Sequence, residues 1–196
     1  MNAAETAEKL LVLLREREAA RSDRSVPFIL AIDGRAASGK STLAALLSSA
    51  LGAPVIRMDD FFLPPELRTK ERYETPGGNL HSERFAAEVL PFLALPAPFS
   101  YRRFDCGKMA LDGDVPVASA RFRIVEGSYS LHPAFGRYAD LSVFLTVSPE
   151  EQIARVRLRG GAPAVSAFSR RWIPLEESYF SFFSIPDRAD VRITNM

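Results

Sequence analysis

The sequence predicts an α/β fold in which a mostly parallel sheet of about five strands lies between helices. Short apolar runs rich in Val, Ile and Phe, typical of strands buried on both faces, alternate along the chain with helix-forming segments. The first apolar run is followed by a glycine-rich turn and a helix, which is the start of a βαβ unit with a right-handed crossover. The length of 196 residues fits one domain, residues 1–196.

The first part of the chain contains two predicted helices and two predicted strands. Segment 1–22 contains an N-terminal helix over about residues 3–20, and a polar connector follows it. The continuous apolar run 27–33 predicts the first strand, and residues 40–52 predict a helix that ends at a glycine. Residues 54–58 predict the second strand, which completes the βαβ unit.

The middle of the chain, residues 61–118, is predicted to be an irregular excursion from the sheet. Residues 61–80 contain three prolines and a Pro-Gly-Gly sequence, which predicts a long ordered loop, and such loops are usually functional. A helix is predicted over 81–93. Residues 95–118 predict an extended segment, with a hairpin turn at Asp112-Gly113. We expect this excursion to bind a substrate.

The last part of the chain returns to the alternating pattern. Strands are predicted over 122–127, 139–147 and 189–194. A helix over 148–160 begins with Ser148 as N-cap, Pro149 at the first position and Glu151 at the third, which is a capping-box arrangement. Residues 165–183 predict a broken helix, whose aromatic side chains are typical of core or of a dimer face, so a homo-oligomer stays open.

Composition and charge argue against several classes of function. Lys and Arg total 25 against 24 Asp and Glu, so the net charge of +1 lacks the basic excess of a nucleic-acid-binding protein. No apolar run approaches the ~18 residues of a membrane span, and the acidic N-terminal segment does not resemble a signal peptide. A single cysteine, Cys106, favours a reducing compartment. We therefore expect a cytoplasmic protein with a small-molecule partner.

One motif carries most of the chemical information. Gly34 to Ser41 match the pattern G-x-x-x-x-G-K-[ST], which curls the backbone so that successive N–H groups surround a phosphate. In this pattern Lys40 reaches the β- and γ-phosphates of a nucleotide, and the Ser41 hydroxyl binds Mg²⁺. Chance produces such an octet in roughly 1% of chains of this length, and here a strand precedes it and a helix follows. The predicted ATP-binding residues are Gly34, Arg35, Ala36, Ala37, Ser38, Gly39, Lys40, Ser41 and Thr42.

Two predicted strands end in acids, and both ends lie at the edge of the sheet where ligands bind in open α/β folds. Asp59 and Asp60 follow the strand 54–58, and Glu126 ends the strand 122–127. Glu126 is the candidate Mg²⁺ ligand beside Ser41. Asp59 is the candidate base for a hydroxyl group of the acceptor, because the aromatic residues after it suggest a pocket for a ring. The competing interpretation of these acids is a cap or a surface position.

Between residues 155 and 171 the chain carries five arginines and no acid. Arg155 and Arg159 are four residues apart and share one face of a helix, and Gly160-Gly161 breaks that helix. We expect segment 155–171 to be a lid whose arginines neutralise charge on a transferred phosphoryl group. A solvated basic helix face is the alternative. A further prediction concerns the acceptor site. We expect its wall to contain Tyr101, Arg102, Phe104, Asp60 and Phe61.

Together these segments resemble the uridine kinase/phosphoribulokinase-like branch of P-loop kinases over roughly residues 27–193. The resemblance rests on GRAASGKST, MDDFF, IVEG and the arginine-bearing helix, with PGGN, YRRFD, VEGSYS and WIPLEE typical of short bacterial proteins labelled uridine kinase or nucleoside kinase-like. It implies a P-loop fold, ATP and Mg²⁺, a base at Asp59, an acid near Mg²⁺ at Glu126, and phosphate-binding arginines at Arg155 and Arg159. One departure is that the uracil-reading Tyr-x-Phe and following His of that family have no clean equivalent, the nearest being Tyr101 to Phe104.

The sequence thus predicts an ATP-dependent kinase that phosphorylates a hydroxyl of a small metabolite, a nucleoside being the first candidate. Pantothenate, a riboside or another hydroxylated metabolite is the alternative acceptor. A nucleotide-dependent switch acting on a protein partner is the alternative of another class, although the N-K-x-D motif of small GTPases is absent. The sequence does not distinguish ATP from GTP as the donor.

Overall fold

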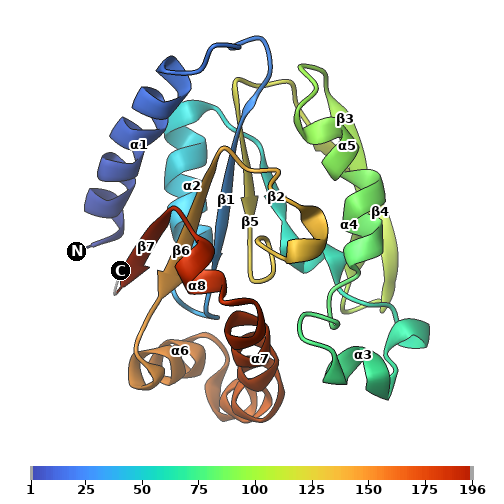
Figure 1. Ribbon diagram of the computed structural model, residues 1–196. Coiled ribbons are helices and arrows are strands. Elements are labelled where there is room, and N and C mark those ends of the chain that lie inside the picture. The colour runs from blue at the N-terminus through green and yellow to red at the C-terminus, as the bar shows by residue number, and fades with distance from the viewer. Residues whose placement is uncertain (1, 195–196) are drawn as a thin grey trace.

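A five-stranded parallel sheet forms the centre of the protein, as expected. The computed structural model describes residues 2–194, and its strand order is β2-β5-β1-β6-β7 with every neighbouring pair parallel (Figure 1). The strands are β1 (Phe28–Gly34), β2 (Val55–Arg57), β5 (Phe122–Glu126), β6 (Leu141–Thr146) and β7 (Val191–Thr194). β1 and β5 are buried along their whole length, which explains their continuous apolar sequences.

The helices surround the sheet on three sides. In Figure 1, α1 and α2 cover one face, α4 and α5 lie on the opposite side with the hairpin β3–β4, and α6 and α7 lie below the carboxyl ends of the strands. The helices are α1 (Ala3–Ala19), α2 (Lys40–Leu51), α3 (Lys70–Glu74), α4 (Ser82–Glu88), α5 (Leu90–Leu93), α6 (Pro149–Ala167), α7 (Ile173–Phe183) and α8 (Ile185–Arg188). No helix within residues 2–194 has the length and apolar character needed to cross a bilayer.

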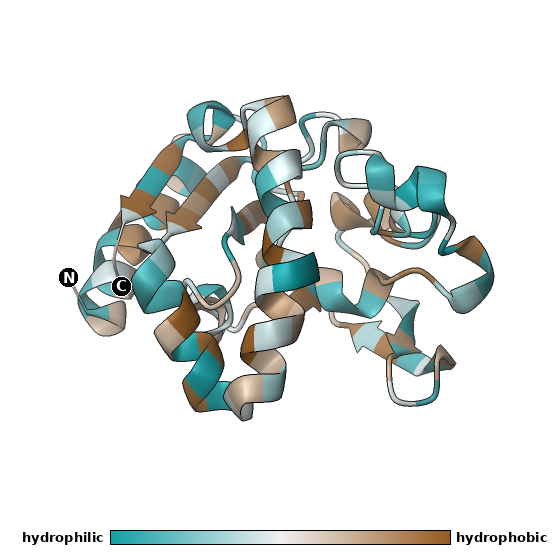
Figure 2. Ribbon diagram, turned by 90° about the horizontal axis from the view of Figure 1, so that it is seen from below, coloured by the Kyte–Doolittle hydropathy of each residue, from teal (hydrophilic) through white to brown (hydrophobic). Residues whose placement is uncertain are grey.

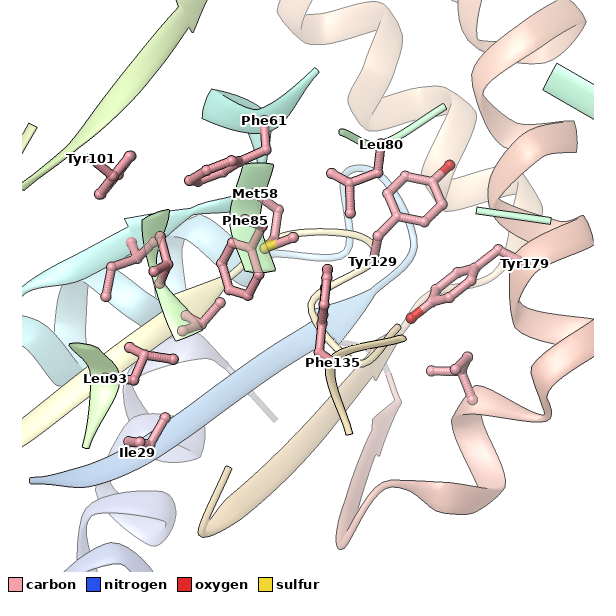
Figure 3. Packing of buried hydrophobic residues seen from close by; sticks show 14 of the residues in the cluster. Ile29, Met58, Phe61, Leu80, Phe85, Leu93, Tyr101, Tyr129, Phe135 and Tyr179 are labelled. Carbon is pink, nitrogen blue, oxygen red and sulfur yellow. The ribbon is translucent and has the colours of Figure 1, made fainter. Parts of the chain in front are cut away.

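Two hydrophobic cores pack on the two faces of the sheet. Phe28, Leu30 and Ile32 of β1 point into the core beneath α1 and α2, because alternate side chains of a strand point to opposite faces. Ile29 points into the other core, which contains the excursion and α7 and which Figure 3 shows from close by. The sheet therefore holds the excursion and the last helices against the same face.

The excursion is more regular than the sequence suggested. The predicted loop 61–80 contains the one-and-a-half-turn helix α3, with Thr69 as its N-cap. The single helix predicted over 81–93 is wrong: α4 and α5 are separate and meet at Val89, whose φ of −122° is not helical. Pro91 lies in α5 and has no N–H to continue the α4 hydrogen-bond ladder.

The hairpin exists, but its turn is not at Asp112-Gly113. Strands β3 (Phe99–Asp105) and β4 (Ala110–Val117) pair antiparallel, so the chain reverses at residues 106–109. Gly113 lies within β4 with a φ of +73°, where the register shifts between Arg102 and Phe104. The glycine therefore serves a β-bulge rather than a turn.

The C-terminal helices follow the prediction with one change. Ser148 caps α6 by accepting a hydrogen bond from the Glu151 N–H at 3.2 Å. α6 extends beyond Gly160 to Ala167, interrupted at Gly161, whose φ of 66° and ψ of −161° break the helical geometry. A π-helical turn, Phe168–Trp172, then joins α6 to α7. The predicted break at Gly160-Gly161 is confirmed, because two helical segments meet there at a kink; the change is that the second segment begins at once rather than at residue 165.

Candidate active site

The glycine-rich loop lies at the carboxyl end of β1, between β6 and the start of α2. Gly34 has a φ of +141°, and a Cβ atom there would lie 2.0 Å from the Leu145 carbonyl oxygen, so no other residue fits. Gly39 has a φ of +101° and forms the N-cap of α2 without a side-chain hydrogen bond. The α2 N-terminus and its unpaired N–H groups therefore face the centre of the loop, which is an arrangement suited to binding an anion.

Lys40 lies inside this loop. Its side chain is 9% exposed, and its ammonium donates hydrogen bonds to the carbonyl oxygens of Gly34 and Arg35, each at 2.8 Å. The positive charge is thus held at the mouth of the loop by two neutral acceptors. Neutral carbonyl partners leave its charge available to an incoming phosphate.

The two strand-end acids meet beside the loop. β2 and β5 are neighbours, with Arg57 opposite Glu126, so Asp59, two residues after Arg57, lies at the same edge of the sheet as Glu126. The Ser41 hydroxyl donates to Glu126 Oε2 at 3.4 Å. The structure therefore brings the two predicted metal ligands together and places Asp59 next to them.

Both acids have altered proton affinities. Burial raises the pKa of Asp59 above its usual value, and the Lys40 ammonium opposes this shift. Burial likewise raises the pKa of Glu126, with Lys40 again lowering it and the charge of Asp59 raising it further. A raised pKa makes each carboxylate a better proton acceptor than an exposed acid.

These residues share a pocket of about 340 Å³. The glycine-rich loop and the two acids line one part of it, and residues of the excursion, of segment 127–129 and of segment 159–176 line the rest. Figure 2 views the molecule from this end, with the helices of the C-terminal region across its front. The lining residues are Ala36, Ala37, Ser38, Gly39, Lys40, Ser41, Asp59, Phe62, Asn79, Glu126, Gly127, Ser128, Tyr129, Arg159, Phe168, Trp172 and Glu176. Gly34, Arg35 and Thr42, which were also predicted to bind ATP, are not among them.

The two lid arginines differ in position. Arg159 lines the pocket. Arg155 contacts the loop from outside: its Nη1 donates to the Ala37 carbonyl at 3.3 Å and its Nε to Glu151 at 2.7 Å. Further along the predicted lid, the Arg171 guanidinium lies over the Tyr73 ring of α3 at 4.6 Å. The lid segment therefore contacts both the glycine-rich loop and the excursion.

The structure does not bring the predicted aromatic wall to this pocket. Phe61 is fully buried and stacks on Tyr101 with 5.1 Å between ring centroids. The Tyr101 hydroxyl donates to Asp60 at 2.7 Å, which ties both side chains into the core beneath the hairpin. Residues 58–61 form a 3₁₀ turn, in which side chains three residues apart face the same side, so Phe62 and not Phe61 lies beside Asp59 at the pocket.

Arg102 and Phe104 lie on the other side of the hairpin. Arg102 forms an ion pair with Glu88 at 2.6 Å, and Phe104 is buried with the Arg68 guanidinium over its ring at 5.9 Å. Together they line a separate depression of about 540 Å³ that contains neither Lys40 nor Asp59.

Sequence reasoning missed Asp33, which organises the whole site. This fully buried carboxylate accepts hydrogen bonds from the N–H groups of Gly34, Tyr129 and Leu131 and from the Tyr179 hydroxyl, at 2.7 to 3.1 Å. It therefore joins the glycine-rich loop to the segment after Glu126 and to α7. An acid inside an otherwise apolar strand was the available signal.

Phe62, one of the aromatic residues after Asp59 that were expected to form a ring pocket, does line the pocket, and sequence reasoning missed the two residues beside it, Asn79 and Trp172. Asn79 is 3% exposed, and its side-chain amide has no hydrogen-bond partner within residues 2–194. Phe62 and Trp172 face each other with 6.0 Å between ring centroids. All three also border a smaller recess of about 150 Å³. Its residues come from distant segments, so no local pattern could reveal it.

The described residues also fit a magnesium ion in the way that nucleotide-binding proteins hold it. Mg²⁺ is usually bound by one or two carboxylates together with the phosphates of the substrate, rather than by a protein cage. Ser41 and Glu126 supply one hydroxyl and one carboxylate. Within residues 2–194 no group of three or more His, Cys, Asp and Glu side chains is arranged around a metal position.

Comparison with known proteins was made at the level of sequence and of structure. No family model and no curated protein matches the sequence. A solved structure titled as a possible uridine kinase from Bacillus stearothermophilus matches with a TM-score of 0.71 and 20% identity, over 96% of this chain and 99% of that chain.

Other solved structures share the arrangement. A candidate fructose transport system kinase from Silicibacter sp. TM1040 matches with a TM-score of 0.68 and 22% identity, over 98% of both chains. D-glycerate 3-kinase from Cryptococcus neoformans matches with a TM-score of 0.50 and 15% identity, over 98% of this chain and 72% of that one. At these identities the likeness establishes the fold. The chain therefore has the P-loop kinase fold, in the form that the uridine kinase-like structure shares over nearly its whole length.

Proposed function

We propose that the protein transfers the γ-phosphoryl group of ATP to a hydroxyl group of a small metabolite. The observation that carries the proposal is the meeting of Lys40, Ser41, Asp59 and Glu126 in one pocket. The pocket combines a cation and an anion-binding loop with the Asp59 carboxylate, whose pKa is raised. Phosphoryl transfer requires these elements at a single point, because a nucleophile must be aligned with a phosphate whose charge is neutralised.

The nucleotide side consists of the loop 34–41 and its flanking residues. The loop N–H groups bind the phosphates, and the Lys40 ammonium turns from the Gly34 and Arg35 carbonyls toward them. Ser41 and Glu126 hold Mg²⁺, which when bound neutralises charge on the phosphate oxygens. Arg159, on the pocket wall, supplies a further positive charge.

The acceptor side is organised by Asp59. Its carboxylate accepts the proton of the acceptor hydroxyl while that oxygen forms its bond to the γ-phosphorus, and the bond between the γ-phosphorus and the bridging oxygen breaks to release ADP. Burial raises the pKa of Asp59, which favours this proton transfer. Phe62 and Trp172 exclude water around the reacting atoms, which limits hydrolysis.

The pocket favours an acceptor other than uridine. Tyr101 and Phe104, the nearest counterparts of the uracil-reading residues, contribute to the core and to a separate depression rather than to this pocket. Asn79, Phe62 and Trp172 are the groups available to a substrate beside Asp59. We therefore expect uridine and cytidine to be poor acceptors, and retain other ribosides, pantothenate and similar hydroxylated metabolites as candidates.

A metabolite screen tests this proposal. ADP release from ATP·Mg²⁺ is measured with and without each of a panel of nucleosides, sugars, polyols and hydroxy acids. We expect at least one compound to stimulate release and to become phosphorylated, as seen by mass spectrometry. A nucleotide switch would release ADP at a rate that no metabolite changes, and that result across the panel would contradict the proposal.

A further inference from the structure

The two peptide groups that flank the Ala36 Cα atom, within the glycine-rich loop, are each held by a side chain from outside the loop. The Ala36 N–H donates to Glu176 Oε2 of α7 at 2.9 Å, and the Ala36 carbonyl accepts from Gln152 Nε2 of α6 at 3.1 Å. Gln152 is 1% exposed and Glu176 is 6% exposed. Because both bonds are shielded from water, each contributes more than an exposed bond to fixing the loop.

The loop needs such support. Ala37, the next residue, has a φ of +58°, in the left-handed region that is unfavourable for a residue with a Cβ atom. A loop that must stay in this conformation before a phosphate arrives requires bonds that make the alternative conformations less stable. The two hydrogen bonds meet this requirement: the Gln152 bond fixes the peptide plane immediately before Ala37, and the Glu176 bond fixes the plane before that one.

Glu176 is also an unexpected residue at this position. Its carboxylate lines the pocket in which anionic phosphates would bind, and it accepts a further hydrogen bond from the Ser128 hydroxyl at 2.7 Å. A buried negative charge opposes the binding of another anion. Glu176 is favourable at this position if its hydrogen bond to the Ala36 N–H stabilises the loop by more than its charge destabilises the bound phosphate.

We propose that Glu176 and Gln152 are positioning residues that hold the two peptide groups flanking Ala36 and so keep the loop 34–41 in its phosphate-binding conformation before the nucleotide binds. The expected effect of these residues on phosphoryl transfer rests on the proposed function, whereas their effect on the conformation of the free loop does not depend on it. The segment WIPLEE, which contains Glu176, thereby acquires a role that its sequence alone did not reveal. Gln152 and Glu176 flank segment 155–171, the expected lid, so the same two side chains also attach the chain on both sides of this segment to the loop.

Two measurements on the full chain test this proposal. Hydrogen exchange of the loop amides is measured in the free protein, and the affinity for ADP·Mg²⁺ is measured by titration calorimetry. Glu176→Ala removes the acceptor, and should speed loop exchange and weaken ADP binding, each by at least about 10-fold, since a bond to a charged group contributes this order in an equilibrium constant. Glu176→Gln keeps an acceptor oxygen for the Ala36 N–H and should stay within about 3-fold of wild type.

Matched variants separate positioning from general damage to the fold. Glu177→Ala removes the neighbouring charge of α7, which forms a partly exposed ion pair with Arg35, and should change both measurements by less than about 2-fold. Gln152→Leu removes only the donor to the Ala36 carbonyl and should speed loop exchange, which provides a second test if Glu176→Ala does not fold.

The outcomes are distinct. Wild-type loop exchange in both Glu176→Ala and Gln152→Leu would overturn the proposal, as would Glu176→Gln matching Glu176→Ala in both measurements. If wild-type protein binds no ADP, the proposed function fails, and loop exchange alone still decides whether these residues position the loop.

Discussion

Replacing Asp33 with Asn tests how the site is built. The carboxylate is fully buried and accepts from four donors, two on each oxygen: Gly34 and Tyr129 on Oδ1, Leu131 and Tyr179 on Oδ2. Asn has nearly the same shape, but one of its two terminal atoms is an NH₂ group. Whichever way the amide turns, two donors face another donor and lose their partner.

The size of the effect follows from this count. A buried donor left without an acceptor costs about 1–3 kcal/mol, so two such donors give a destabilisation of roughly 4 kcal/mol. In a domain of this length a change of 1 kcal/mol shifts the melting temperature by about 2–4 °C, so we expect a decrease of roughly 10 °C.

Thermal and urea denaturation followed by circular dichroism measure this loss of stability. Asp190→Asn is the matched control, because Asp190 also accepts two hydrogen bonds from Ser142 but lies at the surface, and it should change the free energy of unfolding by less than about 1 kcal/mol. A shift below about 2 °C for Asp33→Asn would show that the four bonds are not what joins the loop to its surroundings.

The remaining predictions concern catalysis. Asp59→Asn should lower kcat by about 10²–10⁴ and leave ATP binding intact. Burial raises the pKa of Asp59, and only the ionised carboxylate can accept a proton, so the activity of the wild type should fall as the pH drops through that raised pKa. A pH profile whose activity falls only near the ordinary pKa of Asp would refute the assignment. The same fall in the profile of Asp59→Asn would also refute it. Glu126→Gln should raise the Mg²⁺ concentration needed for half-maximal rate, as a metal titration would show, and an unchanged requirement would remove Glu126 from the metal site. Arg159→Lys should lose at least about 10-fold in kcat, because Arg159 lines the pocket. Arg157→Lys, at an exposed position of the same helix, should keep the wild-type rate. If both variants have the wild-type rate, the arginines form only a solvated basic face.

The sheet and the loop were predictable because their signals are local. Each strand is a short apolar run, and the octet from Gly34 to Ser41 fixes the turn between β1 and α2 without help from distant residues. The meeting of Asp59 and Glu126 was predictable too, since both follow strands whose carboxyl ends share one edge of the sheet.

Errors arose where one local signal fits two structures. Gly113 has the left-handed backbone that its sequence suggests, yet it occupies a bulge, because burial of Tyr101 and Phe104 fixes the register of β3. Phe61 was expected at the acceptor site, but the direction of a side chain in a short 3₁₀ turn depends on the core around it.

Other residues could not have been identified from the sequence at all. Asn79, Gln152 and Glu176 reach the pocket or its loop only because the excursion, α6 and α7 pack against the carboxyl end of the sheet. Their separations along the chain exceed any motif, so their positions depend on tertiary packing alone.

The central claim is that the loop containing Lys40 delivers a phosphoryl group to a hydroxyl compound in the pocket beside Asp59. Its most direct test follows the γ-phosphate label of ATP with the acceptor found by screening, in wild type and in Lys40→Met, which keeps the length of the side chain and removes its charge. We predict transfer of the label to the acceptor in wild type and a loss of at least about 10³-fold in Lys40→Met, with a melting temperature within a few degrees. Label appearing only in inorganic phosphate, or transfer by Lys40→Met at the wild-type rate, would contradict this account.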